Sequence, residues 1–266
     1  MKPVLKYPGS KWRIAKWIVS QIPEHHSYLE PYFGSGAVLF NKKPSKIETI
    51  NDLDNRVYKL FKLIRENPEM LARVINATPY SRYEYDNTFT MAEDTDLEIA
   101  RQFLIQCWQG HGFRTNGYKV GWKNDVQGRE KSYALWNWNR LPGWILEAAE
   151  RLKQVQIENM PAVELVRRFK YDNVLIYIDP PYLLSTRVAK QYKYEMSEED
   201  HIELLETLLQ HPGPVMISGY ESDLYNNILK NWNKTKVRSN KEGGSSTTEV
   251  IWMNYKISNQ LSIFDK

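Results

Sequence analysis

The chain has 266 residues, enough for one large domain or for a domain with an insertion. Its formal net charge of +4 permits a polyanionic partner but does not demand one. The single cysteine, Cys107, excludes internal disulfides and a four-cysteine zinc site, and no apolar run reaches membrane-spanning length. These features favour a reducing compartment such as the cytoplasm and argue against a membrane partner.

The N-terminal residues 6–11 are predicted to form a turn before a helix. Pro8-Gly9 favours the turn, and residues 12–19 have helical apolar spacing. Lys11 stands at the mouth of this helix, where an ammonium can meet a carboxylate or a phosphate. The alternative is a solvated surface lysine, which is favoured for this residue considered alone.

Residues 28–33 are predicted as the first strand and its exit, followed by a Gly-x-Gly turn and a helix. Gly34 and Gly36 would let a ligand approach the backbone closely. The dinucleotide-binding pattern Gly-x-Gly-x-x-Gly is not completed, because Leu39 occupies the place of the third glycine. The turn therefore argues against a dinucleotide cofactor.

Residues 46–51 are predicted as the second strand, which ends in front of Asp52. An acid at this place can accept hydrogen bonds from both ribose hydroxyls of an adenosine. The alternative is the N-cap of the following helix, which begins near Asp54. Both can hold, with Asp52 on the ribose and Asp54 as the cap.

After residue 66 the alternation of strands and helices lapses for about ninety residues, longer than ordinary connections, so residues 67–145 are predicted to be an inserted lobe. Within it, Asn116-Gly117 is a strong hairpin signal. Cations surround this hairpin: Lys119, Lys123, Arg129 and Lys131. A basic, aromatic hairpin can enter a DNA groove or follow phosphates, and the alternative is a solvated surface hairpin.

The alternating pattern resumes at residue 146. Strands are predicted at residues 155–157, 174–178 and 214–218, with helices between them and a closing edge hairpin at residues 234–238 and 248–255. Alternating strands and helices indicate an α/β protein with a largely parallel sheet.

The strand at residues 174–178 is followed by Asp179, Pro180, Pro181 and Tyr182, at the sheet edge where such folds bind ligands. Two prolines fix φ and remove two N–H donors, which leaves a stiff turn with free carbonyls. With a carboxylate and a ring beside it, this turn can accept hydrogen bonds from an amino group and stack a flat ring. An exocyclic amine on a nucleobase fits both demands, and the alternative is an ordinary strand-ending turn capped by the aspartate.

In the order of its motifs, the chain resembles the Dam-like (D12 class) family of N6-adenine-specific DNA methyltransferases. Residues 6–11 are similar to the N-terminal motif of the family, residues 31–36 to its S-adenosylmethionine loop, residues 51–52 to its ribose-binding acid and residues 179–182 to its catalytic motif. Residues 114–120 resemble the DNA-contacting hairpin, and residues 248–252 resemble the closing strand. The lobe lies between the ribose acid and the catalytic motif, as in the alpha arrangement of the family.

The resemblance implies an α/β, Rossmann-like S-adenosylmethionine-dependent methyltransferase fold with a mixed seven-stranded sheet. Residues 1–66 and 146–266 would form the catalytic domain, and residues 67–145 a mainly helical target-recognition lobe that carries a β-hairpin. The implied activity is transfer of a methyl group from S-adenosyl-L-methionine to N6 of a flipped-out adenine in duplex DNA, without a metal. A methyltransferase of RNA or of protein amide groups, and a non-catalytic DNA-binding relative, stay open as alternatives.

The resemblance also implies roles for individual residues, with two aromatic substitutions. Tyr7 stands where relatives often have Trp, and Tyr32 where they often have Phe, so both positions keep a ring. Asn159-Met160 stands where many relatives place an acid and an aromatic near the adenine of the cofactor, which concerns that pocket and not the reaction. The implied catalytic residues are Asp179, Pro180, Pro181 and Tyr182; the implied cofactor-binding residues are Tyr7, Lys11, Tyr32, Gly34, Gly36, Asp52 and Asp179; and the implied DNA-binding residues are Arg114, Asn116, Tyr118, Lys119, Trp122 and Lys123.

The C-terminal tail resembles the short peptide by which many bacterial replication and repair proteins dock on the β sliding clamp. The matching residues are Gln260, Leu261, Ile263 and Phe264. Exposed apolar side chains on a polar tail need a partner pocket, and the alternative is packing back onto the enzyme. A cognate restriction endonuclease is a second partner that the resemblance implies, in a bacterial or phage-encoded system.

Overall fold

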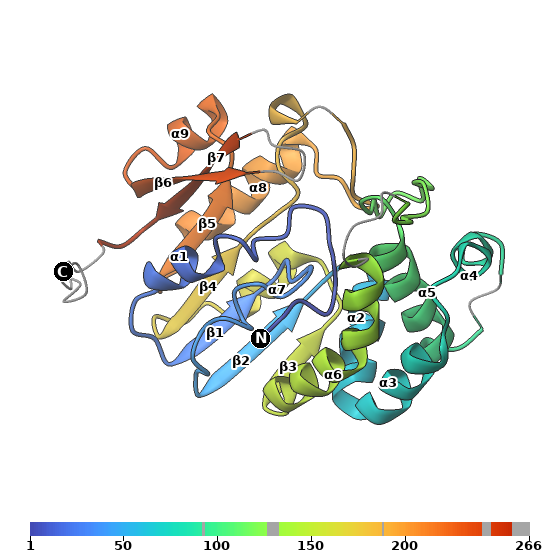
Figure 1. Cartoon of the computed structure of the whole chain (residues 1–266). Coiled ribbons are helices and arrows are strands. Elements are labelled where there is room, and N and C mark those ends of the chain that lie inside the picture. Colours follow the sequence, from blue (N-terminus) through green and yellow to red (C-terminus); the bar gives the residue numbers. More distant parts are fainter. Residues whose placement is uncertain (92–93, 127–132, 188, 241–245, 257–266) are drawn as a thin grey trace, which may run out of the picture.

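The computed structural model describes residues 1–91, 94–126, 133–187, 189–240 and 246–256. Within these residues, seven strands form one sheet in the order β3-β2-β1-β4-β5-β7-β6 (Figure 1). The first five strands in this order are parallel, and β7 runs antiparallel to both of its neighbours. The predicted mixed seven-stranded sheet is confirmed. The strands are β1 Ser27–Glu30, β2 Ile47–Asn51, β3 Val155–Glu158, β4 Val174–Ile178, β5 Val215–Gly219, β6 Asn233–Asn240 and β7 Ser246–Met253.

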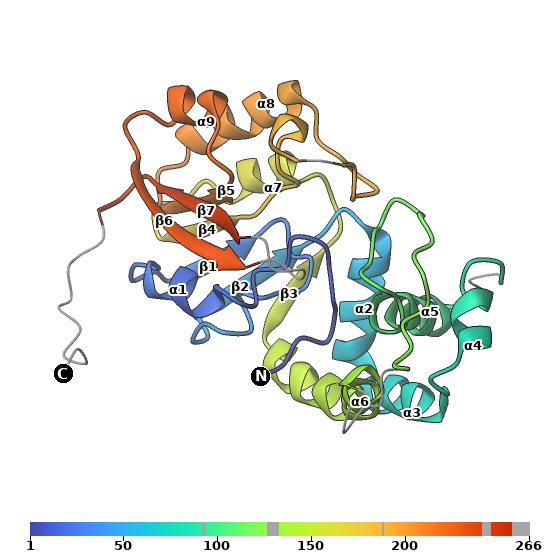
Figure 2. The same ribbon diagram turned by 45° about the horizontal axis from the view of Figure 1, so that its top comes forward.

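Helices cover both faces of this sheet. Figure 2 shows α7, α8 and α9 together above the sheet, with α1 and α2 on the other side. The helices associated with the sheet are α1 Ala15–Ser20, α2 Asn55–Glu66, α7 Ala162–Arg168, α8 Glu198–Leu209 and α9 Asp223–Ile228, with the 3-10 turn η1 Leu184–Thr186 after β4.

Strand β4 shows why both faces must be covered. Leu175 and Tyr177 pack into the core on the α2 side, whereas Val174, Ile176 and Ile178 pack into the core on the α8 side. Successive residues of a strand point to opposite faces, and both faces of this strand are covered, so all five side chains are buried. A continuous apolar run is therefore the sequence mark of a central parallel strand, and its carboxyl end is held rigidly from both sides.

The inserted segment contributes α3 Pro68–Ala77, α4 Arg82–Asn87, α5 Asp96–Gln109 and α6 Tyr133–Leu152 (Figure 1). These helices pack on one another and on α2, so their apolar side chains continue the core on the α2 side of the sheet. Helix α6 runs through the predicted boundary at residue 145, and the helix predicted from residue 146 is its second half. The division into a catalytic domain and a lobe stays a prediction.

The predicted hairpin around Asn116-Gly117 takes a different form. In the described part of the insertion, residues 110–126 form a loop closed at its base by a bridge between Gly110 and Trp122 and by a hydrogen bond from His111 N to Gly121 O of 2.8 Å. Gly117 has the positive φ of 83° that the turn requires. Residues 111–121 form no regular strand, and the backbone N–H of Thr115 donates to Gln191 O, in a distant loop.

One buried ion cluster fastens α6 to the sheet. The carboxylate of Glu48, in β2, lies 2.6 Å from Lys42 Nζ and 2.5 Å from Arg151 Nη1, and Arg151 comes from α6. Burial raises the pKa of Glu48, but hydrogen bonds from Arg151, Lys42 and the backbone of Ser45 outweigh it, so the pKa lies below its ordinary value. The carboxylate therefore stays charged between two cations.

We expect Glu48→Gln to lower the free energy of unfolding by about 3–5 kcal/mol, because it leaves two largely buried cations without their counter-charge. Urea unfolding followed by circular dichroism measures this loss. Glu150→Gln, at the exposed pair with Lys153, is the matched control and should change stability by less than about 1 kcal/mol. The difference in free energy of unfolding between the wild type and Glu48→Gln should vanish as the pH falls through the lowered pKa of Glu48, since a protonated Glu48 is neutral like glutamine. An equal effect of both substitutions would contradict the assignment.

Candidate active site

A cavity of about 530 Å³ opens at the carboxyl ends of β1, β2 and β4. Its walls come from the N-terminal residues 7–11, the exits of the three strands, the start of α7 and the loop of residues 192–196. The chain leaves neighbouring strands β1 and β4 toward opposite faces, and such a switch point leaves a crevice at the sheet edge. The volume is in the range of small-molecule sites, roughly 300–1,000 Å³.

The exits of β1 and β2 build one end of the cavity around Asp52. Asp52 Oδ2 accepts a hydrogen bond of 2.8 Å from Gly34 N, and Oδ1 accepts one of 2.9 Å from Asp54 N. Gly34 and Gly36 both have positive φ, and a Cβ on Gly36 would collide with the ring of Phe33. Each carboxylate oxygen accepts one of these backbone hydrogen bonds and has a second lone pair, and Asp52 lines the cavity, so this end fits the two hydroxyls of a ribose.

The surroundings of Asp52 favour its protonated form. Burial raises its pKa to about 7, although the backbone hydrogen bonds from Asp54 and Gly34 act in the opposite direction. Glu30, at the exit of β1 in the same cavity, is shifted further: burial raises its pKa to about 8, against a hydrogen bond of 2.8 Å from the Tyr28 hydroxyl. Both groups can therefore change charge close to neutral pH.

The other end of the cavity is formed by Asp179 and Lys11. Lys11 Nζ lies 3.0 Å from Asp179 Oδ1 and donates a hydrogen bond of 2.6 Å to Gly9 O. In the described residues, no hydrogen bond besides this ion pair reaches the buried Oδ1. Burial raises the pKa of Asp179, with the ammonium of Lys11 acting against it, and the net pKa lies above its ordinary value. Asp179 is therefore a buried carboxylate at the cavity wall whose Oδ1 is paired with the Lys11 ammonium.

Tyr182 is fixed on three sides. Its hydroxyl donates a hydrogen bond of 2.7 Å to Glu249 Oε2, its ring makes an edge contact with Tyr220 at 4.7 Å, and its carbonyl accepts a hydrogen bond of 2.7 Å from Arg187 Nε. Lys11 Nζ lies 4.7 Å from the centre of its ring. The sequence predicted Tyr182 but not its supports, because Glu249 and Arg187 reach it from β7 and from the loop after β4.

The structure brings most of the predicted catalytic and cofactor residues into this one cavity. Three of the predicted residues, Gly36, Pro180 and Tyr182, are buried and are not among the residues that line the cavity. Tyr192, Glu195 and Met196 also line the cavity and had no recognisable motif in the sequence. The predicted residues in its lining are Tyr7, Lys11, Tyr32, Gly34, Asp52, Asp179 and Pro181, and the buried Tyr182 adjoins it through Lys11.

The six predicted DNA-contacting residues lie in different settings. Tyr118 is 60% exposed, and the Arg114 guanidinium lies 4.8 Å from its ring. Lys119 forms a surface ion pair with Asp86 at 2.8 Å. Trp122 packs inside the lobe against Tyr80, with ring centres 5.6 Å apart. Of the other two, Asn116 is exposed and Lys123 is half-buried.

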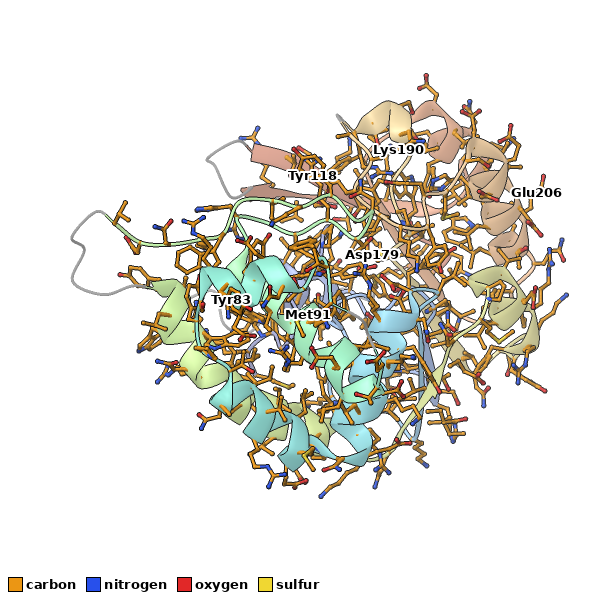
Figure 3. The ribbon with its side chains drawn as sticks, turned by 90° about the vertical axis from the view of Figure 1, so that its right-hand side faces the viewer. Tyr83, Met91, Tyr118, Asp179, Lys190 and Glu206 are labelled. Atoms are coloured by element: carbon orange, nitrogen blue, oxygen red, sulfur yellow. The ribbon has the colours of Figure 1, made fainter. Side chains whose placement is uncertain are left out.

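Figure 3 places Asp179 inside the molecule, below the labelled Tyr118 and Lys190. The two upper segments are in contact, since Asn116 Nδ2 donates a hydrogen bond of 3.2 Å to Lys190 O. The exposed residues of the insertion therefore lie close to the loop that covers the cavity.

A mixed seven-stranded sheet with helices on both faces and a cavity at the carboxyl ends of its parallel strands is consistent with the Rossmann-like fold of S-adenosylmethionine-dependent methyltransferases. A family model described as D12 class N6 adenine-specific DNA methyltransferase matches residues 7–242, and the chain belongs to this family. The protein is a DNA adenine methyltransferase that acts on N6, and membership implies S-adenosylmethionine as methyl donor and duplex DNA as substrate.

Curated relatives extend this similarity over nearly the whole chain. Type II methyltransferase M1.LlaDCHI of Lactococcus lactis subsp. cremoris is 26% identical over 280 residues, which cover 96% of this chain and 96% of that protein. Type II methyltransferase M.MjaIII of Methanocaldococcus jannaschii is 25% identical over 270 residues, with coverages of 89% and 91%. A solved structure, the rRNA methyltransferase aviRa from Streptomyces viridochromogenes, aligns with a TM-score of 0.40 at 12% identity over 93% of this chain and 85% of that one. Across the described ranges, no helix combines the length and apolar character needed to cross a bilayer.

The pKa of Asp52 predicts how cofactor affinity depends on pH. An aspartate must be ionised to accept hydrogen bonds from two hydroxyls, and with a pKa of about 7 the free protein loses that state on acidification. We expect the affinity for S-adenosylmethionine to be level above about pH 8 and to fall toward tenfold per pH unit below the pKa. Calorimetric titrations across this range measure it. Asp52→Asn should bind more weakly and lose this pH dependence; an unchanged pH profile in that variant would assign the effect to another group.

Proposed function

We propose that Asp52 and Asp179 divide the work of this cavity between the cofactor and the target base. The observation that carries the proposal is that both carboxylates line one cavity: each oxygen of Asp52 accepts one backbone hydrogen bond among the described residues, and Asp179 Oδ1 is paired with the Lys11 ammonium. Asp52 would accept the ribose hydroxyls of S-adenosylmethionine, with Gly34 and Gly36 giving its backbone close approach. Tyr7, Lys11 and Tyr32 would line the same binding site.

Lys11 indicates what the Asp179 end can bind. Its ammonium places N–H donors against Asp179 Oδ1 and lies over the ring of Tyr182, so one group uses a carboxylate acceptor and an aromatic face together. An adenine offers the same two features, an amine and a flat ring, in one molecule. This arrangement supports a site for the exocyclic amine of a target adenine, with the base stacked on Tyr182.

The chemistry proposed for these residues is orientation. N6 is unreachable inside a base stack, so the adenine must leave the duplex. Asp179 and the Pro180 carbonyl accept the two N6 hydrogens and localise the nitrogen lone pair, while Pro181 keeps the turn rigid. S-adenosylmethionine, when bound, supplies an electrophilic methyl group on a cationic sulfur. The nitrogen can release its proton after it has gained the methyl group, so Asp179 need not be a full general base.

DNA would be held by the insertion, residues 67–145, acting as the target-recognition lobe. Arg114, Asn116, Tyr118 and Lys119 lie exposed or half-buried beside the loop over the cavity. Cations next to an aromatic ring suit phosphates and unstacked bases. Lys123 would add a further cation, and Trp122 would act by supporting the lobe, because it packs inside it.

The relatives named as type II methyltransferases suggest the biological setting. By that similarity, the protein would act in the cytoplasm of a bacterium, or be phage-encoded, as a site-specific adenine methyltransferase. It would protect DNA against a cognate restriction endonuclease that recognises the same sequence.

Asp179→Ala should abolish methyl transfer, by at least about 100-fold in rate, because the amine loses the acceptor that orients its lone pair. Transfer of labelled methyl groups to DNA measures the rate. Thermal unfolding and S-adenosylmethionine binding of the same variant serve as controls, and both should persist. Formation of N6-methyladenine at the wild-type rate would contradict the role of Asp179.

We also propose that the tail docks on a β sliding clamp through Gln260, Leu261, Ile263 and Phe264, which lie outside the described residues. The support is the spacing of the three apolar residues on a polar tail. A peptide of residues 258–266 should bind a purified bacterial clamp in a calorimetric titration, and a peptide with Leu261 and Phe264 changed to alanine should not. Equal binding, or no binding by either peptide, would dispose of the proposal.

A further inference from the structure

Thr115 is a buried residue within the exposed tip of the insertion. It is 2% exposed, whereas Asn116 beside it is exposed and Tyr118 is 60% exposed. Its neighbours Arg114 and Asn116 belong to the proposed DNA surface. A buried hydroxyl at this place needs hydrogen-bond partners, and all of those partners lie outside the tip itself.

The first set of partners is the loop after β4. Thr115 N donates to Gln191 O at 2.8 Å, and Thr115 Oγ1 accepts a hydrogen bond of 2.7 Å from Lys193 N. Asn116 adds its hydrogen bond to Lys190 O. The Thr115 hydroxyl also donates a longer hydrogen bond of 3.4 Å to Gln191 O, so four hydrogen bonds join residues 115–116 to residues 190–193, more than seventy positions further along the chain.

The same loop covers the cofactor cavity. Tyr192 lines the cavity, and its hydroxyl donates a hydrogen bond of 3.1 Å to Pro8 O in the N-terminal motif. The ring lies 6.1 Å from that of Tyr7, and a Cβ on Gly9 would collide with the Tyr192 hydroxyl. The position of residues 190–193 therefore decides how the N-terminal wall of the cavity is closed.

The loop is also tied to the catalytic motif. Glu195 Oε1 accepts hydrogen bonds from Gln191 N at 2.6 Å and Tyr192 N at 2.9 Å, and its carboxylate pairs with Arg187. Arg187 Nε in turn donates to Tyr182 O at 2.7 Å. A continuous set of hydrogen bonds thus runs from Thr115 through the loop to the tyrosine proposed to stack on the base.

A separate path leads from Thr115 to the ribose end of the cavity. Its carbonyl accepts a hydrogen bond of 3.1 Å from Arg56 Nη2, and the Arg56 guanidinium also pairs with Asp54 at 3.4 Å. Asp54 caps α2 and donates its backbone N–H to Asp52. Both ends of the cavity are therefore connected to one threonine at the tip of the insertion.

We propose that Thr115 is a positioning residue that couples DNA recognition to cofactor binding. The inference rests on the proposed function, because it takes the neighbours of Thr115 as DNA contacts and the cavity as the cofactor site. In this proposal each ligand holds the loop of residues 190–195 in place, so the ligand that binds second finds the loop already held. Linkage then requires that DNA and cofactor raise each other's affinity by the same factor.

The coupling factor is the dissociation constant of S-adenosylhomocysteine without DNA divided by that with a duplex which the wild type methylates. S-adenosylhomocysteine lacks the methyl group, so no reaction consumes the complex. We expect a wild-type factor between about 5 and 150, the usual span of allosteric coupling. Thr115→Val removes the hydroxyl that Lys193 N requires while keeping the size of the side chain, and the factor should fall to near one.

Two further variants separate coupling from stability. Thr115→Ser keeps the hydroxyl and should retain the wild-type factor. Thr88→Val removes another buried hydroxyl of the insertion, one that donates to Tyr85 O at 2.7 Å within the same helical turn, and should also leave the factor unchanged. If Thr115→Val fails to fold, Tyr192→Phe tests the same path from the loop side, because it removes the hydrogen bond to Pro8 O; its factor should fall as well.

A wild-type factor of one, or an undiminished factor in Thr115→Val, would overturn the proposal, even if that variant bound both ligands more weakly. A purely structural role for the hydroxyl would lower the two affinities without changing their ratio. A wild type that methylates no DNA or binds no S-adenosylhomocysteine would instead overturn the proposed function, which keeps the two failures distinct.

Discussion

A carboxylate buried at the end of a central strand needs a nearby positive charge, and Lys11 supplies it to Asp179. The two side chains come from distant parts of the sequence, the N-terminal turn and the exit of β4, and meet 3.0 Å apart. Burial alone would lower the pKa of Lys11, but the negative charges of Asp179 and Glu249 raise it above its ordinary value. The ammonium therefore stays charged and keeps an acceptor poised at the sheet edge.

The rest of the fold holds this pair in place. Apolar side chains alternate into two cores along β4, so neither face of the strand can slide, and its exit is as rigid as the sheet. Around that exit the supports are polar: Glu249 holds the Tyr182 hydroxyl, and Arg187 holds its carbonyl. A site that orients a reacting amine requires both the rigid packing of β4 and the directed hydrogen bonds around its exit. A flexible acceptor would not localise the nitrogen lone pair.

The insertion is joined to the catalytic part in two physically different ways. Below, α6 continues through both parts and Arg151 reaches the buried Glu48, so the connection there is a packed core with a buried charge cluster. Above, hydrogen bonds join the tip to the loop over the cavity. Hydrogen-bonded loops open at lower free energy than packed helices, so relative movement is expected at the tip and not at the base.

Local patterns in the sequence determined the strand at residues 174–178, the glycine turn, the cap at Asp54 and the types of residue in the cavity, because each depends on periodicity or on the chemistry of a few adjacent residues. The family's motif order also indicated the sheet and the reaction. Only the tertiary structure decided which side chains support Tyr182, that Thr115 faces the loop rather than a hairpin partner, and that α6 crosses the expected boundary. The contacts of Tyr182 with Glu249 and of Thr115 with Lys193 join residues 67 and 78 positions apart, and their energies appear only once the chain has folded.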